Sequence, residues 1–272
     1  MDKDWLERYL DLLGIKGREP TFETLREVAS AHKRVSFANA PSLLRKAATP
    51  HGPVPALNND EVLTAWSTTF AGGVCYELSA MVRDLLQGLN FDAYVVMASI
   101  QNPRLHHANI VRLGDQRFLL DLGNGAPLFE PIPIDEGPQE IEFAGLAYRF
   151  ERLGDEGALT QSRWIDGQWK PFASYEAEPA TVEDQLEGFQ SHHQLPAKSF
   201  VMQNFTLVQT GEDAVLALVN HTFTYYKRSG KVSRDVQGID AYRGVIRAEF
   251  GLAAYPVDEA LAAWSKVTGA TI

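Results

Sequence analysis

The 272-residue sequence contains a single cysteine, Cys75, and this scarcity excludes two classes of structure. One cysteine cannot form an internal disulfide bond, and it cannot supply a zinc site built from several cysteines. A free cysteine is most often a buried and inert packing residue, and less often a reactive group. Cys75 is therefore either part of a core or a nucleophile.

Basic side chains are also scarce, because 25 lysines and arginines stand against 35 aspartates and glutamates, giving a formal net charge of −10. Nucleic-acid binding needs a basic face, so no nucleic-acid partner is expected. No apolar run approaches the roughly 18 residues that cross a bilayer, so no membrane partner is expected. The first five residues lack the basic-then-apolar order of a signal peptide. The sequence therefore predicts a cytoplasmic protein.

Length and composition predict a folded chain of more than one unit. A 45% apolar fraction with 10% aromatic residues is enough to bury a sizeable core. The length lies above the usual size of one domain, which favours two or three packed units. We expect these units to be ordered as helices, then β structure, then a mixed α/β region.

The spacing of apolar residues along the chain predicts this order of helices and strands. Apolar residues at helical spacing predict helices at 5–13, after Thr21, and from Cys75 to Gly88, with a proline-containing loop at 41–55. From Tyr94 the period changes to that of a strand. Strands are predicted at 94–100, 106–113, 117–122, 147–152, 158–163 and 168–173. Helices return near 182–189, 241–250 and 257–267, and a β region lies at 205–226.

The surroundings of Cys75 favour a reactive thiol. Cys75 follows Gly72-Gly73-Val74 and begins a predicted helix. The free amides of a helical first turn carry partial positive charge, which stabilises a thiolate, and they can also stabilise an oxyanion during acyl transfer. The two glycines let the backbone approach a substrate closely.

A nucleophilic thiol needs a histidine base and a carboxylate to orient it. The strand that begins His106-His107 and the strand that ends in Asp121 form the arms of one predicted hairpin, with Gly114 first in a two-residue turn. In that register His106 lies on the same face as Asp121, whereas His107 points to the opposite and wetter face with Asn109. A three-residue loop would reverse the choice between the two histidines.

Two other interpretations of these residues remain open at this point. The adjacent histidines could be a solvated strand end or a metal pair, although neighbouring strand residues diverge and His192-His193 has no cysteine nearby. Asp121 could be a turn-capping carboxylate before Gly123. We expect no metal site.

With these residues in place, the sequence resembles the arylamine N-acetyltransferase family. That family carries Arg-Gly-Gly-x-Cys-Phe/Tyr-Glu, a histidine in a following strand, and Asp-x-Gly-Phe-Gly about fifteen residues after the histidine. The matching residues here are Ala71-Gly72-Gly73-Val74-Cys75-Tyr76-Glu77, His106 and Asp121-Leu122-Gly123-Asn124-Gly125. Further similar segments are Tyr9-Leu10 with Gly14-Ile15, His32 with Ser36-Phe37-Ala38-Asn39, and Glu249-Phe250-Gly251-Leu252.

The resemblance implies an α+β fold with the Cys-His-Asp arrangement of cysteine proteases. A helical bundle at residues 1–90 would carry Cys75, a β-barrel-like domain at 91–195 would carry His106 and Asp121, and residues 196–272 would form an α/β lid. The implied reaction is ping-pong acetyl transfer from acetyl-CoA to an arylamine, hydrazine or arylhydroxylamine nitrogen. Cys75 would hold the acetyl group, His106 would pair with the thiolate and later accept the amine proton, and Asp121 would orient His106.

Three positions depart from the family pattern. Ala71 replaces the motif arginine and Ala38 replaces a glutamate, and these two family residues are expected to pair beneath the active site. Losing both is self-consistent, because losing one would leave a buried charge. Asn124 replaces a phenylalanine that helps to shape the acceptor pocket, and asparagine adds two donors and an acceptor there. The sequence thus indicates a divergent member of the family.

The resemblance also gives candidate binding residues. Phe37, Val74, Asn124 and Phe205 are expected to line the substrate pocket, although a phenylalanine such as Phe205 lies more often in a core. Gly125 is expected near the pantetheine or pyrophosphate of coenzyme A. No permanently bound cofactor is expected; acetyl-CoA or another acyl thioester would be a co-substrate, and a small-molecule amine the acceptor.

Three alternative functions use the same residues. An amide synthase of the same family would take a larger acyl group from coenzyme A or from an acyl carrier protein, and Asn124 favours this reading slightly. A papain-like protease or transglutaminase shares the Cys, His, Asp order, but the Gly-Gly-Val-Cys-Tyr-Glu and Phe-Gly-Leu segments argue against it. A non-catalytic binding module would not need all three candidate catalytic side chains, which are present.

Overall fold

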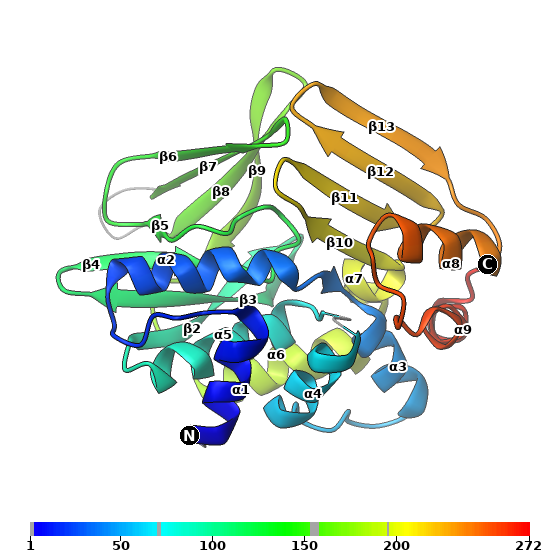
Figure 1. The fold of residues 1–272 in the computed structure, drawn as a ribbon, viewed down its shortest axis with the longest axis horizontal. Helices are drawn as coiled ribbons and strands as arrows, with labels where there is room; N and C mark the ends of the chain where they lie inside the picture. The colour runs from blue at the N-terminus through cyan, green and yellow to red at the C-terminus, as the bar shows by residue number, and fades with distance from the viewer. Residues whose placement is uncertain (1–2, 70–71, 153–157, 195) are drawn as a thin grey trace.

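The computed structural model describes residues 3–69, 72–152, 158–194 and 196–272. Within these residues the named strands form two antiparallel sheets, one of eight strands and one of five. In the view of Figure 1 one end of each sheet stands above the N-terminal helices. The arrangement is the expected α+β fold, with helices first, a near-closed eight-stranded barrel next, and a sheet with helices last.

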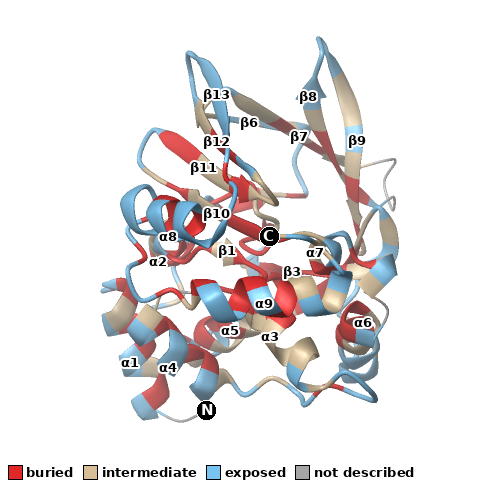
Figure 2. Ribbon diagram, turned by 90° about the vertical axis from the view of Figure 1, so that its right-hand side faces the viewer, coloured by how far each residue is buried: buried red, intermediate tan, exposed pale blue. Residues whose placement is uncertain are grey.

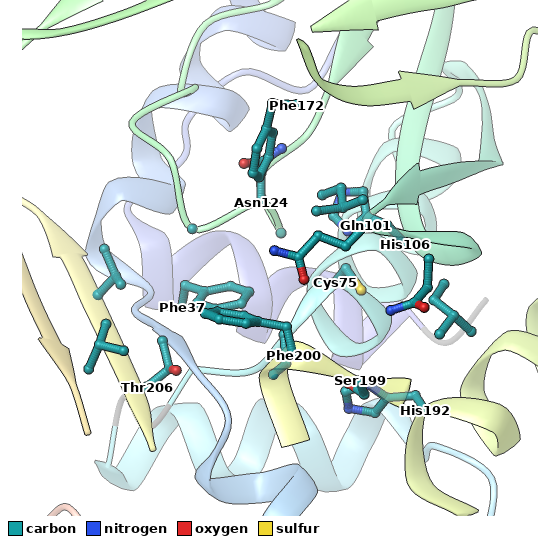
Figure 3. Close-up of a pocket in the computed structure, with 18 of the residues that line it drawn as sticks. Phe37, Cys75, Gln101, His106, Asn124, Phe172, His192, Ser199, Phe200 and Thr206 are labelled. Atoms are coloured by element: carbon teal, nitrogen blue, oxygen red, sulfur yellow. The ribbon is translucent and has the colours of Figure 1, made fainter. Parts of the chain in front are cut away.

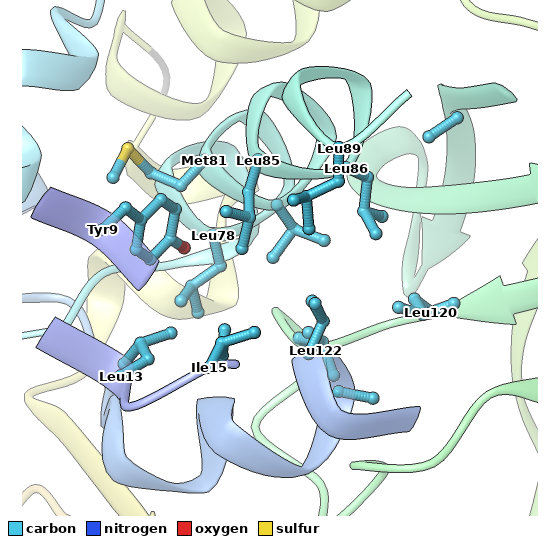
Figure 4. Close-up of a cluster of buried hydrophobic side chains, with 14 of the residues drawn as sticks. Tyr9, Leu13, Ile15, Leu78, Met81, Leu85, Leu86, Leu89, Leu120 and Leu122 are labelled. Carbon is cyan, nitrogen blue, oxygen red and sulfur yellow. The ribbon is translucent and has the colours of Figure 1, made fainter. Parts of the chain in front are cut away.

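The N-terminal helices pack around α5, the helix that begins at Cys75. They are α1 (Lys3–Leu13), α2 (Phe22–Ala31), α4 (Asn59–Thr69) and α5 (Cys75–Gly88). Each has one apolar face; Tyr9 of α1 and Leu85 of α5 are both fully buried in the cluster that these helices share (Figure 4). Thr21 caps α2, because its hydroxyl accepts the Thr24 N–H at 3.2 Å.

The eight-stranded sheet contains the hairpin that carries the histidine and the aspartate. Its order is β5-β4-β3-β2-β9-β8-β7-β6. The strands are β2 (Asp92–Ile100), β3 (Asn102–Leu113), β4 (Gln116–Leu120), β5 (Ile132–Pro133), β6 (Gln139–Phe143), β7 (Leu146–Arg152), β8 (Leu159–Ile165) and β9 (Gln168–Tyr175). The helix α6 (Val182–Gln194) and α5 both pack on β3.

The five-stranded sheet joins the C-terminal region to a short N-terminal strand. Its strands are β1 (Phe37–Ala38), β10 (Thr206–Thr210), β11 (Ala214–Val219), β12 (Thr222–Lys227) and β13 (Gly230–Asp235). The helices of this part of the molecule are α3 (Ala40–Ala48), α7 (Phe200–Gln203), α8 (Ile239–Ala248) and α9 (Val257–Thr268). They share a second buried cluster with β10, β11 and β12, whereas β13 is exposed along its whole length (Figure 2).

One helix, α3, overlaps the predicted loop at 41–55, and a second, α4, lies where the sequence analysis names no element. Pro41 stands in the first turn of α3, where its missing N–H would have no helical partner anyway, so this proline begins a helix instead of preventing one. In α4 three side chains alone are buried, namely Val62, Leu63 and Trp66, so its apolar face is too short to give a clear period. The predicted division at residues 90 and 195 stays a prediction. β1 pairs with β10 of the C-terminal sheet, and α3 shares the buried cluster of the C-terminal helices.

Among the described residues, no helix combines the length and the apolar character that a membrane span requires.

Candidate active site

The loop before Cys75 is held in place by the backbone around β1. The Ala38 N–H donates to the Gly73 carbonyl at 2.9 Å, and the Gly73 N–H donates to the Ser36 carbonyl at 3.4 Å. Gly72 has φ +69°, and a Cβ there would lie 1.8 Å from the Ser36 carbonyl oxygen. Only glycine fits this position, because both the backbone conformation and the space exclude a side chain.

Cys75 is the first residue of α5 and is buried, with 6% of its surface exposed. The Glu77 carboxylate accepts the Val74 N–H at 3.0 Å, and Arg45 donates to its other oxygen at 2.8 Å. This ion pair fixes the start of the helix and neutralises a carboxylate that is 1% exposed. The amides of the first turn favour negative charge at the Cys75 sulfur.

The β3–β4 hairpin has the predicted register. Leu113 pairs with Gln116, and Gly114 between them has φ +61°, as a type II′ turn requires. His106 and Asp121 consequently lie on one face, and the His106 Nε2 is 2.8 and 3.0 Å from the two carboxylate oxygens of Asp121.

The chain just after Asp121 lies directly against the start of α5. A Cβ at Gly123 would be 2.6 Å from the Cα of Cys75, so a larger residue would separate the two elements. His106 also forms a hydrogen bond with Cys75. Asp121 occupies Nε2, which leaves Nδ1 as the ring nitrogen for the thiol. The three predicted catalytic side chains are therefore in consecutive contact.

Two opposing effects act on the charge of His106. Burial alone would lower its pKa, but the negative charges of Asp121 and Cys75 and the hydrogen bonds to both outweigh burial and raise the pKa from 6.5 to about 10. The imidazolium is therefore the stable form of His106 at neutral pH, and it lies between a carboxylate and the thiol sulfur.

The carboxylate of Asp121 has further donors that the sequence did not reveal. The Tyr175 hydroxyl and the Asn124 Nδ2 both donate to Oδ2, each at 2.7 Å. The Gln161 Oε1 lies 2.8 Å from the same hydroxyl and 3.1 Å from the same amide nitrogen. Burial and the Asp121 charge raise the pKa of Tyr175 well above its ordinary value, so its hydroxyl stays a donor.

The amide of Asn124 is oriented by these contacts. Its nitrogen must face the Asp121 carboxylate, because an amide oxygen there would repel it. The Asn124 Oδ1 therefore faces the other way and accepts a hydrogen bond from Arg163 Nη2 at 3.2 Å. This asparagine, which replaces a phenylalanine of the family motif, connects Asp121 to Arg163.

A cavity of about 330 Å³ opens onto Cys75 and His106. Figure 3 shows Phe37 and Phe200 on one side of the Cys75 sulfur and Asn124 with Phe172 above it. The other residues that line the cavity are Ile100, Gln101, Asn102, Leu105, Gly123, Gly125, Arg163, His192, Ser199, Val201, Thr206, Val208 and Val219. The cavity is largely apolar and has polar groups at its walls, as is usual for small-molecule sites.

The predicted binding residues divide into two groups. Phe37, Asn124 and Gly125 line the cavity. Val74 does not; it is buried behind Cys75 in a small apolar cluster. Phe205 does not line it either, because it is fully buried between α8 and α9, in T-shaped contact with Tyr242.

Of the departures from the family motif, Ala38 is fully buried, and Ala71 lies outside the described residues. His107 points away from the cavity, as its parity predicts, but the predicted wet surface is wrong. Its side chain is covered by α5 and α6, with its ring centroid 4.5 Å from that of Tyr76. Burial lowers the pKa of His107 to about 3, so this histidine is neutral.

Sequence reasoning missed Tyr175, Gln161, Arg163 and Arg45. The sequence contains a signal for two of them. Leu159, Gln161 and Arg163 are spaced two apart on a strand and so share one face, and polar residues on the face of a core leucine are uncommon. Within the described ranges, no group of three or more histidine, cysteine or acidic side chains could hold a metal ion.

Comparisons with known proteins place this architecture. The sequence model of a family described as N-acetyltransferase matches residues 21–256. The chain matches none of the curated proteins with which it was compared.

Several solved structures share the fold. The arylamine N-acetyltransferase from Mycobacterium abscessus is 23% identical, with a TM-score of 0.79, over 96% of this chain and 94% of that one. The Mycobacterium marinum enzyme in complex with CoA is 20% identical, with a TM-score of 0.80, over 97% and 99%. The Salmonella typhimurium enzyme is 20% identical, with a TM-score of 0.78, over 97% and 99%. At these identities the likeness establishes the fold.

Proposed function

The chain belongs to the arylamine N-acetyltransferase family, and from this premise we propose that it moves an acetyl group from acetyl-CoA to an amine through an acetyl-Cys75 intermediate. It is an acyltransferase of the EC 2.3.1 class.

One observation carries the proposal: Cys75, His106 and Asp121 are in consecutive contact at the wall of one cavity. A thiolate beside an imidazolium is a competent nucleophile, and a carboxylate holds the ring in the correct orientation. The N-terminus of α5 supplies amides that stabilise the oxyanion formed during acyl transfer.

The first half-reaction transfers the acetyl group to the enzyme. The Cys75 thiolate attacks the thioester carbonyl of acetyl-CoA, a new carbon–sulfur bond forms, and the bond to the coenzyme A sulfur breaks. His106 gives its proton to the departing thiolate, so free coenzyme A leaves and His106 becomes neutral. The Asp121 carboxylate stabilises the charged imidazole before this step.

The second half-reaction releases the amide. The acceptor nitrogen attacks the acetyl-Cys75 carbonyl, and the neutral His106 accepts the proton that the nitrogen loses. The carbon–sulfur bond to Cys75 breaks, and the thiolate–imidazolium pair is restored. Because the pKa of His106 is about 10, the ring keeps this proton between cycles. A histidine with the ordinary pKa of about 6.5 would be mostly unprotonated at neutral pH.

Coenzyme A as the donor is supported by the related Mycobacterium marinum enzyme, whose structure contains CoA. Gly125 is our candidate for a contact with the pantetheine or pyrophosphate, because it lies in the cavity wall with its Cα beside the Phe37 ring. The acceptor would be an arylamine, hydrazine or arylhydroxylamine nitrogen. Phe37 and Asn124 are our candidates for acceptor contacts.

A second candidate uses the same chemistry with a larger acyl group, carried by coenzyme A or by an acyl carrier protein. The observation that favours it is Asn124, whose amide makes the cavity wall more polar than a phenylalanine would. A panel of arylamines and hydrazines with acetyl-CoA and longer acyl thioesters separates the two. Turnover of long thioesters together with failure to acetylate any amine would favour the second candidate.

Intact-mass measurement after incubation with acetyl-CoA tests the mechanism. One acetyl adduct is expected on the wild-type protein and none on Cys75→Ala, the variant without a thiol. His106→Ala is expected to abolish the adduct, and His107→Ala, its neighbour on the opposite face, to form it with a mild loss of rate. An adduct that survives Cys75→Ala would refute the assignment.

A further inference from the structure

Arg163 is a cation in the cavity wall for which the proposed reaction has no use. It lies on β8, and its side chain is half-buried. The guanidinium carbon is 3.2 Å from the centroid of the Phe172 ring and 5.7 Å from the centroid of the Tyr148 ring. The close contact with Phe172 is a cation–π contact that helps to hold the guanidinium in place.

In the part of the chain that the structure describes, this guanidinium forms no ion pair. Arg45, the other arginine near the site, pairs with the Glu77 carboxylate at 2.8 Å. Arg163 has instead one hydrogen bond to the neutral Asn124 Oδ1, and its Nε is buried with no partner. A guanidinium has five N–H donors, so most of its hydrogen-bonding capacity is unused.

Asp121 is not the missing partner. Its oxygens already accept from His106, Asn124 and Tyr175, and the Asn124 amide stands between the carboxylate and Arg163. Burying a cation without a partner is costly, and burial lowers the pKa of Arg163 accordingly. A negative group that enters the cavity would recover this cost.

We propose that Arg163 binds the carboxylate of a substrate, so that the molecule reacting at Cys75 is an acid with an apolar body. A planar guanidinium offers two parallel N–H groups, which match the two oxygens of a carboxylate. The cavity between Arg163 and Cys75 is lined by Phe37, Phe172 and Phe200, which suit an aromatic or aliphatic body. The inference deepens the proposed function, on which it rests, and names the substrate class.

The carboxylate can belong to either substrate. If the acceptor carries the carboxylate, the acceptor is an aromatic amino acid with its amine and its carboxylate at opposite ends of a ring. If the donor carries the carboxylate, the donor is a thioester of a dicarboxylic acid, and Arg163 binds its free carboxylate. Both share the chemistry that Arg163 recognises.

Protection of the single thiol gives a binding assay that needs no acyl transfer. Benzoate and its neutral isostere benzamide, and likewise hexanoate and hexanamide, are titrated against the rate at which iodoacetamide alkylates Cys75. We expect a carboxylate to give half-protection at a roughly 10- to 100-fold lower concentration than its amide. In Arg163→Gln the two should protect within about twofold of each other.

The matched control is Arg149→Gln. Arg149 lies on the neighbouring strand, also stacks on an aromatic ring at 4.5 Å, and pairs with Glu140, but it does not line the cavity. It should keep the full preference for carboxylates. Arg163→Lys keeps a charge without the planar fork and should show an intermediate preference, which keeps the test decisive if Arg163→Gln is unstable.

Turnover then identifies the source of the carboxylate. The acceptor arm compares 4-aminobenzoate with 4-aminobenzamide under acetyl-CoA, and the donor arm compares succinyl-CoA with butyryl-CoA for adduct formation on Cys75. The arm in which Arg163→Gln reduces the preference identifies the substrate that carries the acid.

Four results would overturn the inference. Equal protection by both acids and their amides in the wild-type protein would do so, as would a preference that survives Arg163→Gln. Equal losses for charged and neutral ligands would show that Arg163 acts through Asn124 on Asp121 instead. An Arg163-dependent preference in neither turnover arm would remove the substrate role. Failure of the proposed function is a separate result, because no thioester would then form an adduct on Cys75.

Discussion

Replacing Asp121 with asparagine removes the charge on which the protonation of His106 depends. The substitution keeps the size of the side chain and one of the two oxygens, so the effect on charge can be separated from an effect on packing. Asp121 is 1% exposed, and its nearest groups are His106, Asn124 and Tyr175. All three present donors to the carboxylate.

The magnitude follows from the pKa of His106. A pKa of about 10 in place of 6.5 corresponds to roughly 5 kcal/mol of stabilisation of the imidazolium. This is a net value, because burial opposes the two negative neighbours. Without the Asp121 charge burial prevails, and we expect the pKa of His106 in Asp121→Asn to fall below 6.5. At pH 7.5 the variant would then hold a neutral imidazole beside Cys75.

Two assays follow the change. Histidine NMR should show His106 protonated up to about pH 10 in the wild-type protein and neutral above pH 6.5 in the variant. Alkylation of Cys75 near pH 7 should be slower in the variant than in the wild-type protein, because the imidazolium beside the sulfur is lost. Acetyl transfer near pH 7 should fall by roughly 10²- to 10⁴-fold, the order expected when the carboxylate of a triad is replaced. Asp115→Asn, in the exposed turn of the same hairpin, is the control.

Stability provides an independent check with a defined sign. Because the folded pKa of His106 is raised, its contribution to the free energy of unfolding is complete below pH 6.5 and is lost as the pH rises through about 10. The difference in stability between wild-type protein and Asp121→Asn should therefore shrink between these values. An unchanged rate of alkylation near pH 7, or an unchanged His106 titration, would refute the reasoning.

Three further predictions concern packing and acid. Gly123→Ala should reduce alkylation and acetylation of Cys75 and cost about 1–3 kcal/mol of stability, because the new methyl group would lie 2.6 Å from the Cys75 Cα. The control Gly137→Ala has nothing within 4 Å of its new methyl group and should be neutral. Comparable melting curves and rates for the two variants would contradict this prediction. Phe205→Ala should lower the free energy of unfolding by about 3–5 kcal/mol in denaturant but leave the KM for the acceptor unchanged, because the ring lies in the C-terminal core. A raised KM without destabilisation would show that Phe205 is a pocket residue. Burial lowers the pKa of His32 to about 4, so its contribution to stability, roughly 3 kcal/mol, is present above pH 6.5 and lost as the pH falls toward 4. Other buried histidines add losses of the same sign, so urea unfolding of His32→Gln should show a weaker pH dependence than that of the wild-type protein. An unaltered slope would show that His32 does not contribute.

The contacts that the sequence predicted are those fixed by local geometry. The turn at Gly114 sets the strand register, and strand alternation then places His106 with Asp121 and His107 on the opposite face. The helix start at Cys75 likewise follows from the glycine pair before it. In each case the relevant atoms are within about fifteen residues of one another, so backbone rules suffice.

The contacts that the sequence did not predict depend on how distant strands close. Tyr175 reaches Asp121 from 54 residues away, because β9 pairs with β2 at the side of the hairpin. Phe205 looked like a pocket residue by resemblance, but the C-terminal helices enclose it. Asn124 was recognised as a departure from the motif, yet its partners become visible only when the barrel brings Gln161 and Arg163 to it.

The strand β1 has a consequence for the order in which the protein is made. Its two residues pair with β10 and hold the loop before Cys75, so the position of Cys75 depends on a strand that begins at Thr206, about 130 residues later. At 5–20 residues per second, a ribosome needs roughly 6–26 s to cover that distance. A nascent chain that stops before β10 has its only thiol but lacks the strand that positions it. Translation would therefore delay the proposed chemistry at Cys75 until β10 has emerged.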